Sequence, residues 1–269
     1  MLIMQYAKEG NLHDYLQKNF VDIDWWLKIG ILNQISEGLR NIHDANLIHR
    51  DFHSGNILVG VKYDLDFHIG DLGLSQPASE TSFNNEIYGV ISYVAPEVFN
   101  GAKFSKASDI YSLGMIMWEC TSGCKPFANV EHDIELIYNI INGKRPEITK
   151  DTPECFANLM KSCWELDPKK RPSIHEVYNT LNDWNPYEYP YNEIAEQSIN
   201  QAEKKRLELI QLKLLDPNFN VRHPRAIFTS RSLSPFISKV SSINSISSLP
   251  INENVLTFIL FLRVYFKRI

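Results

Sequence analysis

Residues 49–59 read His-Arg-Asp-Phe-His-Ser-Gly-Asn-Ile-Leu-Val, and this stretch decides how the rest of the chain is understood. It sets a carboxylate, Asp51, five residues ahead of an amide, Asn56, and ends in an apolar run typical of a buried strand. A second carboxylate, Asp71, follows another strand-like run at residues 67–70. Carboxylate and amide oxygens are the hard ligands that Mg²⁺ prefers. The sequence therefore offers three oxygen-bearing side chains in compact order as candidate ligands for a divalent cation.

The motifs around this stretch carry a family resemblance. Asp71 opens the motif D-L-G, and residues 95–97 read A-P-E. Either motif alone is more often a turn or a helix start than a catalytic site. In this order and at these separations they resemble the H-R-D-x-x-x-x-N, D-F-G and A-P-E set of eukaryotic-type protein kinases, with Leu72 in place of Phe. The resemblance covers residues 1–184.

Later segments extend the resemblance. Residues 109–114 (DIYSLG) are similar to the start of the family's central buried helix. Cys163-Trp164 and the D-P-x-x-R-P run at 167–172 resemble a late signature common in the tyrosine and tyrosine-kinase-like groups. The resemblance implies that Glu97 and Arg171 form a buried ion pair. Residues 223–233 (HPRAIFTSRSL) resemble, more weakly, a stretch found after the kinase domain in fungal kinase-like proteins.

The resemblance implies a role for each catalytic residue. Asp51 would orient the accepting hydroxyl of a protein substrate and take its proton. Asn56 and Asp71 would bind Mg²⁺. Arg50 would pair with a phosphate on the activation loop, where Thr81, Ser82 and Tyr88 offer hydroxyls. The alternative for these three hydroxyls is simple hydration.

The other cofactor implied by the resemblance is ATP. The backbone groups of Gln5 and Ala7 would bind the adenine in a hinge segment, and Leu58 would pack beneath the ring. An ordinary strand end at residues 4–7 is the alternative reading of the hinge. His49 and Leu72 are expected to be packing residues.

The sequence departs from the family pattern in important places. No two of its glycines are two residues apart, so a G-x-G-x-x-G loop is absent, and there is no strand lysine of the V-A-I-K type. We therefore expect a C-terminal lobe whose N-terminal lobe is missing, most simply through an incomplete gene model. His53 and Gly55 occupy positions where kinases usually carry a cation after the catalytic aspartate, and Gly89-Val90 replaces the family's Gly-Thr.

Two functional hypotheses follow from these observations. The first is a tyrosine-kinase-like protein kinase whose acceptor, Ser/Thr or Tyr, cannot be read from the sequence. The second is a non-catalytic interaction module, a pseudokinase, which keeps the surface of the lobe and binds partners. The charged amphipathic segment 193–215 offers such a partner surface.

Hydrophobic patterning predicts the organisation of the chain. Apolar residues recur at helical spacing in 25–45, 134–142, 155–164 and 173–184, and residues 109–121 are apolar nearly all round. The fold class expected is α+β, mainly α, with short β hairpins. The predicted boundaries are a kinase-type domain at 1–184, a linker at 185–192, an amphipathic helix at 193–216 and a flexible tail at 217–269. Nine serines in residues 230–248 indicate that flexibility.

Charge and cysteine content limit the setting in which the protein works. The formal charge is −9 over residues 1–185 and +4 over residues 186–269, so the acidic first part argues against nucleic acid as the main partner. The four cysteines form no C-x-x-C pair, which suggests reduced thiols and a cytoplasmic location. The apolar run within residues 255–262 is too short to span a bilayer, which takes about 20 apolar residues.

Overall fold

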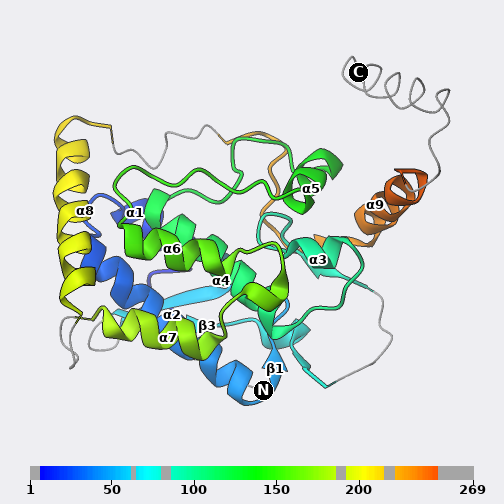
Figure 1. Ribbon diagram of the computed structural model, residues 1–269, viewed down its shortest axis with the longest axis horizontal. Coiled ribbons are helices and arrows are strands. Elements are labelled where there is room, and N and C mark those ends of the chain that lie inside the picture. Colours follow the sequence, from blue (N-terminus) through cyan, green and yellow to red (C-terminus); the bar gives the residue numbers. More distant parts are fainter. Residues whose placement is uncertain (1–6, 62–64, 80–85, 186–191, 215–221, 248–269) are drawn as a thin grey trace.

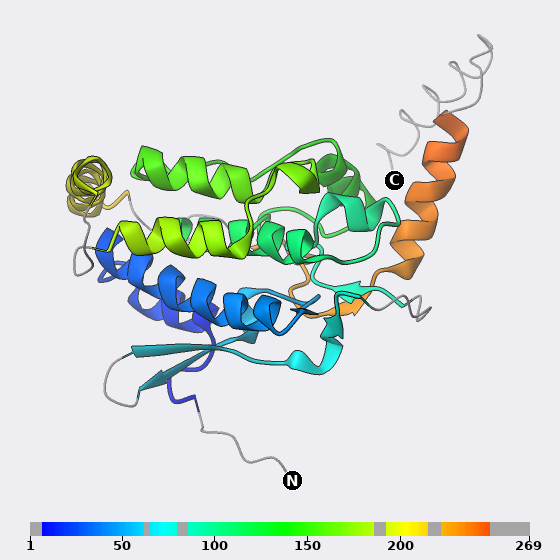
Figure 2. The ribbon, with the colours of Figure 1, turned by 60° about the horizontal axis from the view of Figure 1, so that its bottom comes forward.

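The computed structural model describes residues 7–61, 65–79, 86–185, 192–214 and 222–247. Helices dominate these residues, and short antiparallel strands pair at one side of them (Figures 1 and 2). This arrangement confirms a helix-rich α+β fold.

Two long helices form the centre of the protein. Helix α2 (Trp25–Asp44) begins at Asp24, whose side chain accepts a hydrogen bond from a backbone N–H of the first turn. Helix α4 (Lys106–Ser122) begins with a capping box at Ser105 and ends at Gly123 in a left-handed conformation. Fourteen consecutive residues of α4, from Ser108 to Thr121, are buried, so this helix lies inside the core as its sequence predicted.

Shorter helices surround this centre. Helix α7 packs against α2, and α6 packs against α4 (Figure 1). The contact with α6 is close at Gly114, where an added Cβ would lie 3.0 Å from the Cβ of Cys163. The remaining helices and the two just named are α1 (Leu12–Asn19), α3 (Pro96–Phe99), α5 (Ile134–Ile141), α6 (Glu154–Cys163), α7 (Ile174–Asp183), α8 (Glu193–Gln211) and α9 (Ser234–Ser247).

The described strands form three antiparallel pairs. β2 (Ile57–Val61) pairs with β3 (Leu65–Ile69), with Ile57 opposite Ile69. β1 (Leu47–Ile48) pairs with β4 (Gln76–Pro77). The third pair joins distant parts of the chain: β5 (Tyr88–Gly89) pairs with β6 (Arg231–Ser232).

The end of the chain differs from the sequence-based expectation. The helix expected at 193–216 ends at Gln211, and Lys213 beyond it adopts a left-handed conformation. The tail expected to be flexible is ordered over residues 222–247, because Leu233 and Val240 bury their side chains in the core. Residues 186–191 of the linker expected at 185–192, and the apolar segment at 255–262, lie outside the described residues. Within the described residues, no helix is both long and apolar enough to cross a bilayer.

Helix α8 uses its apolar face within the chain. Ala195, Ile199 and Ala202 are buried where α8 meets α2 and α6. Arg206 binds Glu203 and donates to the carbonyl oxygen of Val21 at 2.8 Å. The small apolar residues of α8 are therefore covered by the lobe itself, whereas Ile194 and Leu207 are exposed, so a partner surface on this helix stays a prediction.

The expected ion pair between Glu97 and Arg171 is confirmed. The guanidinium donates from Nη1 to Oε1 and from Nη2 to Oε2, both at 2.7 Å. It also donates to the carbonyl oxygen of Ala107 at 2.9 Å. The Arg171 side chain is fully buried, so the pair joins the A-P-E segment to the helical core.

We predict that Arg171→Ala lowers the free energy of unfolding by about 3–5 kcal/mol, because it leaves the Glu97 carboxylate without its buried partner. Urea unfolding at pH 7 measures this change. Lys205→Ala is the matched control, since its pair with Glu208 is about half exposed and contributes about 0–1 kcal/mol. Equal losses in the two variants would contradict the assignment.

Candidate active site

The loop at residues 49–51 is held by one carboxylate from helix α4. Asp109 accepts hydrogen bonds from the backbone N–H of His49 at 2.8 Å and of Arg50 at 3.1 Å. Nε2 of His43 lies 3.0 Å from the same carboxylate. Arg50 has φ +73°, a conformation that a non-glycine residue keeps only when its surroundings hold it there. Sequence reasoning found residues 109–114 only as a helix start and missed this contact.

Asp51 directly follows the two residues whose N–H groups bind Asp109, and it is largely buried. It is 5% exposed, and its backbone N–H donates to Nδ1 of His49 at 3.3 Å. Nδ1 of His53 accepts from the N–H of Gly55 at 3.1 Å, so the proton of a neutral His53 is on Nε2, 3.7 Å from the Asp51 carboxylate. Burial lowers the pKa of His53, and the Asp51 carboxylate opposes that shift. His53 therefore provides a polar N–H near Asp51 and no fixed charge.

Asn56 connects the three residues that the sequence singled out. Its side-chain Nδ2 donates to the carbonyl oxygen of Asp51 at 2.9 Å. Its backbone carbonyl accepts from the N–H of Gly70 at 2.7 Å, and Gly70 directly precedes Asp71. His49, which is fully buried as expected, contacts the carbonyl oxygen of Gly70 at 3.1 Å. Asp51, Asn56 and Asp71 are thus brought to neighbouring backbone positions.

Asp71 faces solvent at the start of a short 3-10 helix, Leu72–Leu74. It adopts a left-handed conformation, with φ +53°, and its side chain makes no capping hydrogen bond. Leu72 is 49% exposed, so among the described residues it has no packing partner that covers it, and its expected packing between this lobe and a missing one stays a prediction. The strained backbone directs an ionisable side chain and an apolar one outward together.

The oxygen donors at this place fit a magnesium ion. Asn56 uses its side-chain N–H on Asp51, which leaves its amide oxygen as the donor, and Asp71 adds an exposed carboxylate. No group of three or more His, Cys, Asp or Glu side chains suited to a metal occurs among the described residues. Two protein ligands are what Mg²⁺ commonly takes, because it keeps water and binds phosphate oxygens.

The expected adenine contacts are described in part. Gln5 lies outside the described residues. Ala7 is half-buried, and the chain just after it runs beside β2, where the N–H of Glu9 donates to Val59 and the N–H of Val59 donates to Gly10. Leu58, on this strand, is also half-buried. Leu58 and the residues that follow Ala7 therefore lie on the same edge of the lobe.

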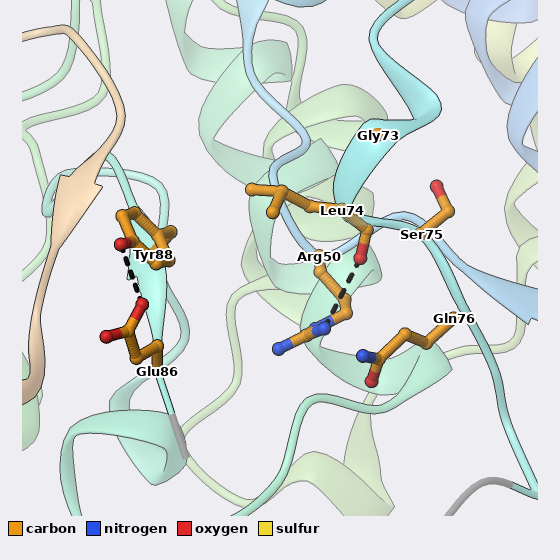
Figure 3. A pocket seen from close by; sticks show the side chains of 7 residues that line it. All are labelled: Arg50, Gly73, Leu74, Ser75, Gln76, Glu86 and Tyr88. Carbon is orange, nitrogen blue, oxygen red and sulfur yellow. Dashed lines mark hydrogen bonds between the residues drawn. The ribbon is translucent and has the colours of Figure 1, made fainter. Parts of the chain in front are cut away.

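A cavity of about 330 Å³ lies beside Arg50. Figure 3 shows the Arg50 side chain pointing into it, where Nη1 donates to the carbonyl oxygen of Leu74 at 3.4 Å. On the other side of the cavity Tyr88 donates to Glu86 at 2.8 Å (Figure 3). That hydrogen bond raises the pKa of the exposed Tyr88 hydroxyl. Of the three activation-loop hydroxyls, Tyr88 is described, whereas Thr81 and Ser82 lie outside the described residues.

A buried polar network supports the segment after β5, and no local sequence pattern indicates it. Oη of Tyr93 donates to Oε2 of Glu119 at 2.5 Å, and Nδ1 of His13 lies 2.7 Å from Oε1 of the same carboxylate. The hydroxyl of Ser112 donates to the Tyr93 carbonyl oxygen at 2.8 Å. Burial, with the Glu119 carboxylate close by, raises the pKa of Tyr93 well above its ordinary value. Helix α4 therefore holds both the loop at 49–51 and the segment at 90–94.

Comparison with known proteins identifies the family. The family model described as protein tyrosine and serine/threonine kinase matches residues 1–181. The chain belongs to this family of protein kinases, which confirms the family expected from the motifs.

The relatives are long proteins. A probable serine/threonine-protein kinase of Dictyostelium discoideum is 31% identical over 189 residues, which are 65% of this chain and 11% of the relative. The probable serine/threonine-protein kinase roco8 of the same organism is 32% identical over 193 residues, 68% of this chain and 10% of the relative. A putative serine/threonine-protein kinase/receptor of Acanthamoeba polyphaga mimivirus is 32% identical over 182 residues, which are 67% of this chain and 11% of the relative. The chain spans about a tenth of the length of these relatives.

We predict that His53 makes the folded protein less stable as the pH falls below 6.5, the ordinary pKa of histidine. Below that pH the unfolded chain takes up a proton that the buried ring resists, so the free energy of unfolding decreases until the pH reaches the lowered pKa of the folded state. Urea unfolding between pH 7.5 and 5 should show a shallower decrease for His53→Gln than for the parent protein. The exposed His68→Gln is the control, and equal slopes for the parent and His53→Gln would refute the prediction.

Proposed function

We propose that this chain carries the catalytic loop and the magnesium ligands of an ATP-dependent protein kinase. The observation that carries the proposal is the double contact of Asn56, which binds the carbonyl oxygen of Asp51 and the N–H that precedes Asp71. A base for the accepting hydroxyl and two hard oxygen ligands are the protein groups that phosphoryl transfer requires. The names of the relatives favour Ser or Thr hydroxyls as acceptors.

Each residue has a defined part in this mechanism. The Asp51 carboxylate orients the substrate hydroxyl and takes its proton as the oxygen attacks the γ-phosphorus and the bond to the ADP oxygen breaks. Asn56 and Asp71 hold Mg²⁺, which neutralises charge on the phosphates when it is bound. Nε2 of His53 lies 3.7 Å from the Asp51 carboxylate and adds a polar group to the site without a fixed charge. Backbone groups of Gln5 and Ala7 would bind the adenine, and Leu58 would pack against it.

The remaining nucleotide contacts are proposed to come from an N-terminal lobe that these 269 residues do not include. The absence of a G-x-G-x-x-G loop and of a strand lysine in the sequence supports this, as does the exposed Leu72, which would pack on such a lobe. The C-W and D-P-x-x-R-P motifs favour the tyrosine-kinase-like group.

Sequencing the 5′ end of the transcript tests the origin of the missing lobe. We predict an upstream reading frame that encodes a glycine-rich loop and, after it, a strand lysine. A mature transcript whose only open frame starts at Met1 would contradict an incomplete gene model.

Arg50 is the proposed partner of a regulatory phosphate. It lines the cavity beside Tyr88, and a phosphate on Tyr88, Thr81 or Ser82 would bind its guanidinium in a two-pronged geometry and order the loop. Glu86 would then repel a phosphate on Tyr88, so the Tyr88–Glu86 hydrogen bond belongs to the unmodified state.

The alternative function is a non-catalytic interaction module. The uncharged His53 and the small Gly55 at positions where related kinases carry a cation favour it. A cytoplasmic location stays a prediction from the cysteine content in either case.

We predict that Asp51→Asn lowers kcat about 10²–10⁴-fold in the full-length natural protein, the usual contribution of a positioned base. Asp71→Asn should weaken the magnesium-dependent binding of ATP and abolish measurable transfer. Calorimetric titration with Mg-ATP and transfer of labelled phosphate to a protein substrate measure the two effects.

The exposed Asp183→Asn serves as the matched control and should keep both properties. A folded full-length protein that binds Mg-ATP with the same affinity after Asp71→Asn, or that transfers no phosphate with all of these residues intact, would favour the interaction module.

A further inference from the structure

The C-terminal segment adds a strand to the activation segment. In this pair Ser232 lies opposite Tyr88 and Arg231 opposite Gly89. The N–H of Leu233 continues the pairing by donating to the carbonyl oxygen of Ile87 at 2.7 Å. Figure 3 shows this second strand running beside Tyr88. A segment about 140 residues further along the chain therefore satisfies backbone groups next to the candidate active site.

This added strand ends close to the catalytic carboxylate. A Cβ placed on Gly89 would lie 3.6 Å from Cδ1 of Leu233 and 3.9 Å from Oδ1 of Asp51. Cγ2 of Val94 is closer still, at 2.7 Å, so Val94, Leu233 and Asp51 surround Gly89. Leu233 is fully buried and Asp51 is 5% exposed. The tail therefore reaches the surroundings of the proposed base.

Arg231 gives the segment a second specific contact. Its Nη2 donates to the carbonyl oxygen of His132 at 2.7 Å, and its guanidinium lies 5.1 Å from the ring centre of Phe236. Arg231 and Leu233 are two residues apart, so they project from the same face of an extended strand. The site beside Gly89 thus accepts a basic and a large apolar side chain with one residue between them.

Residues 222–228, which precede β6 in the sequence, fix the position of this strand. The ring of Phe228 packs edge-on against His132 with centres 4.7 Å apart. His132 also donates its backbone N–H to Arg225, and Arg225 forms an ion pair with Glu131 at 2.6 Å. These contacts join residues 222–228 to the loop that precedes α5.

Helix α9 anchors the other end of the segment. It contacts α3 and α5, which lie beside it in Figure 1. Phe236 and Ile237 pack against the core, and Val240 is 1% exposed. The strand at 231–233 is therefore held in place against β5 from both sides.

We propose that Ile87–Gly89 is the binding edge for the protein substrate and that residues 231–233 occupy it as a built-in competitor. This inference rests on the proposed function. The substrate is then an extended protein segment that adds as an antiparallel strand, with a basic residue two positions before a large apolar one. Backbone hydrogen bonds provide affinity in such binding, and pockets for alternate side chains provide specificity. The tail side chain that reaches Gly89 is a leucine, which has no hydroxyl to accept phosphate, so the tail blocks the site.

A binding experiment tests the proposal without requiring catalysis. The probe is a fluorescent peptide with the sequence of residues 228–238 (FTSRSLSPFIS), titrated against the 269-residue protein. Leu233→Asp in the protein should release the tail and tighten peptide binding by at least about tenfold, because a tethered segment competes at an effective concentration in the millimolar range. Arg231→Glu should act in the same direction.

The matched control adds the same charge at an exposed position of α9, Ser238→Asp, and should bind the probe as weakly as the parent protein. A second probe with Asp at the position of Leu233 should not bind any variant. Equal affinity of the first probe for the parent and for both tail variants would overturn the proposal. So would hydrogen exchange that maps the bound peptide away from residues 87–89.

Phosphate transfer by the full-length natural protein separates this inference from the proposed function. If both are correct, Leu233→Asp lowers KM for a protein substrate with little change in kcat, and the peptide inhibits in competition with the substrate and not with ATP. If only the proposed function is wrong, the difference in peptide binding persists without transfer. If only the tail inference is wrong, transfer occurs and the tail variants behave like the parent.

Discussion

The carboxylate of Asp109 is the contact on which the geometry of the catalytic loop depends. It binds two successive backbone N–H groups, and one of them belongs to Arg50, whose left-handed conformation costs about 1–3 kcal/mol. Helix α4 can hold Arg50 in this conformation because it is buried along most of its length and cannot shift to relieve the backbone strain. Asp51 directly follows Arg50, and Asn56 lies five residues further along the chain. Helix α4, at the centre of the core, therefore determines where the side chains of the candidate site lie.

Local patterns were sufficient to predict most of the helices. Helical periodicity located α2, α5, α6 and α7 to within about two residues, because their apolar faces repeat within one element. The grouping of Asp51, Asn56 and Asp71 came from the order of the family motifs, and the pairing of β2 with β3 is compatible with it, because Asn56 directly precedes β2 and Asp71 follows β3. The Glu97–Arg171 pair came from the family resemblance and not from any spacing.

Contacts between distant residues left no comparable signal. Asp109 binds residues about 60 positions earlier, and Glu119 meets His13 about 106 positions away. The serine content of the tail indicated flexibility, but a few buried side chains, Leu233 and Val240 among them, decide that it is ordered. Composition averages over a segment, whereas docking depends on the few residues that reach the core. Leu72 is exposed among the described residues, so its expected packing on a missing lobe cannot be read from the contacts within this chain.

The pairing of β5 with β6 has a consequence for biosynthesis. Helices α1 to α7 precede residue 184, so this part of the lobe can fold before residues 222–228, β6 and α9 are translated. Elongation proceeds at roughly 5–20 residues per second, which leaves the nascent lobe uncovered for some seconds. During that interval the newly made protein would meet its targets without its own C-terminus in the way. Ribosome pausing or an alternative 3′ exon would then change how long, or whether, the site stays open.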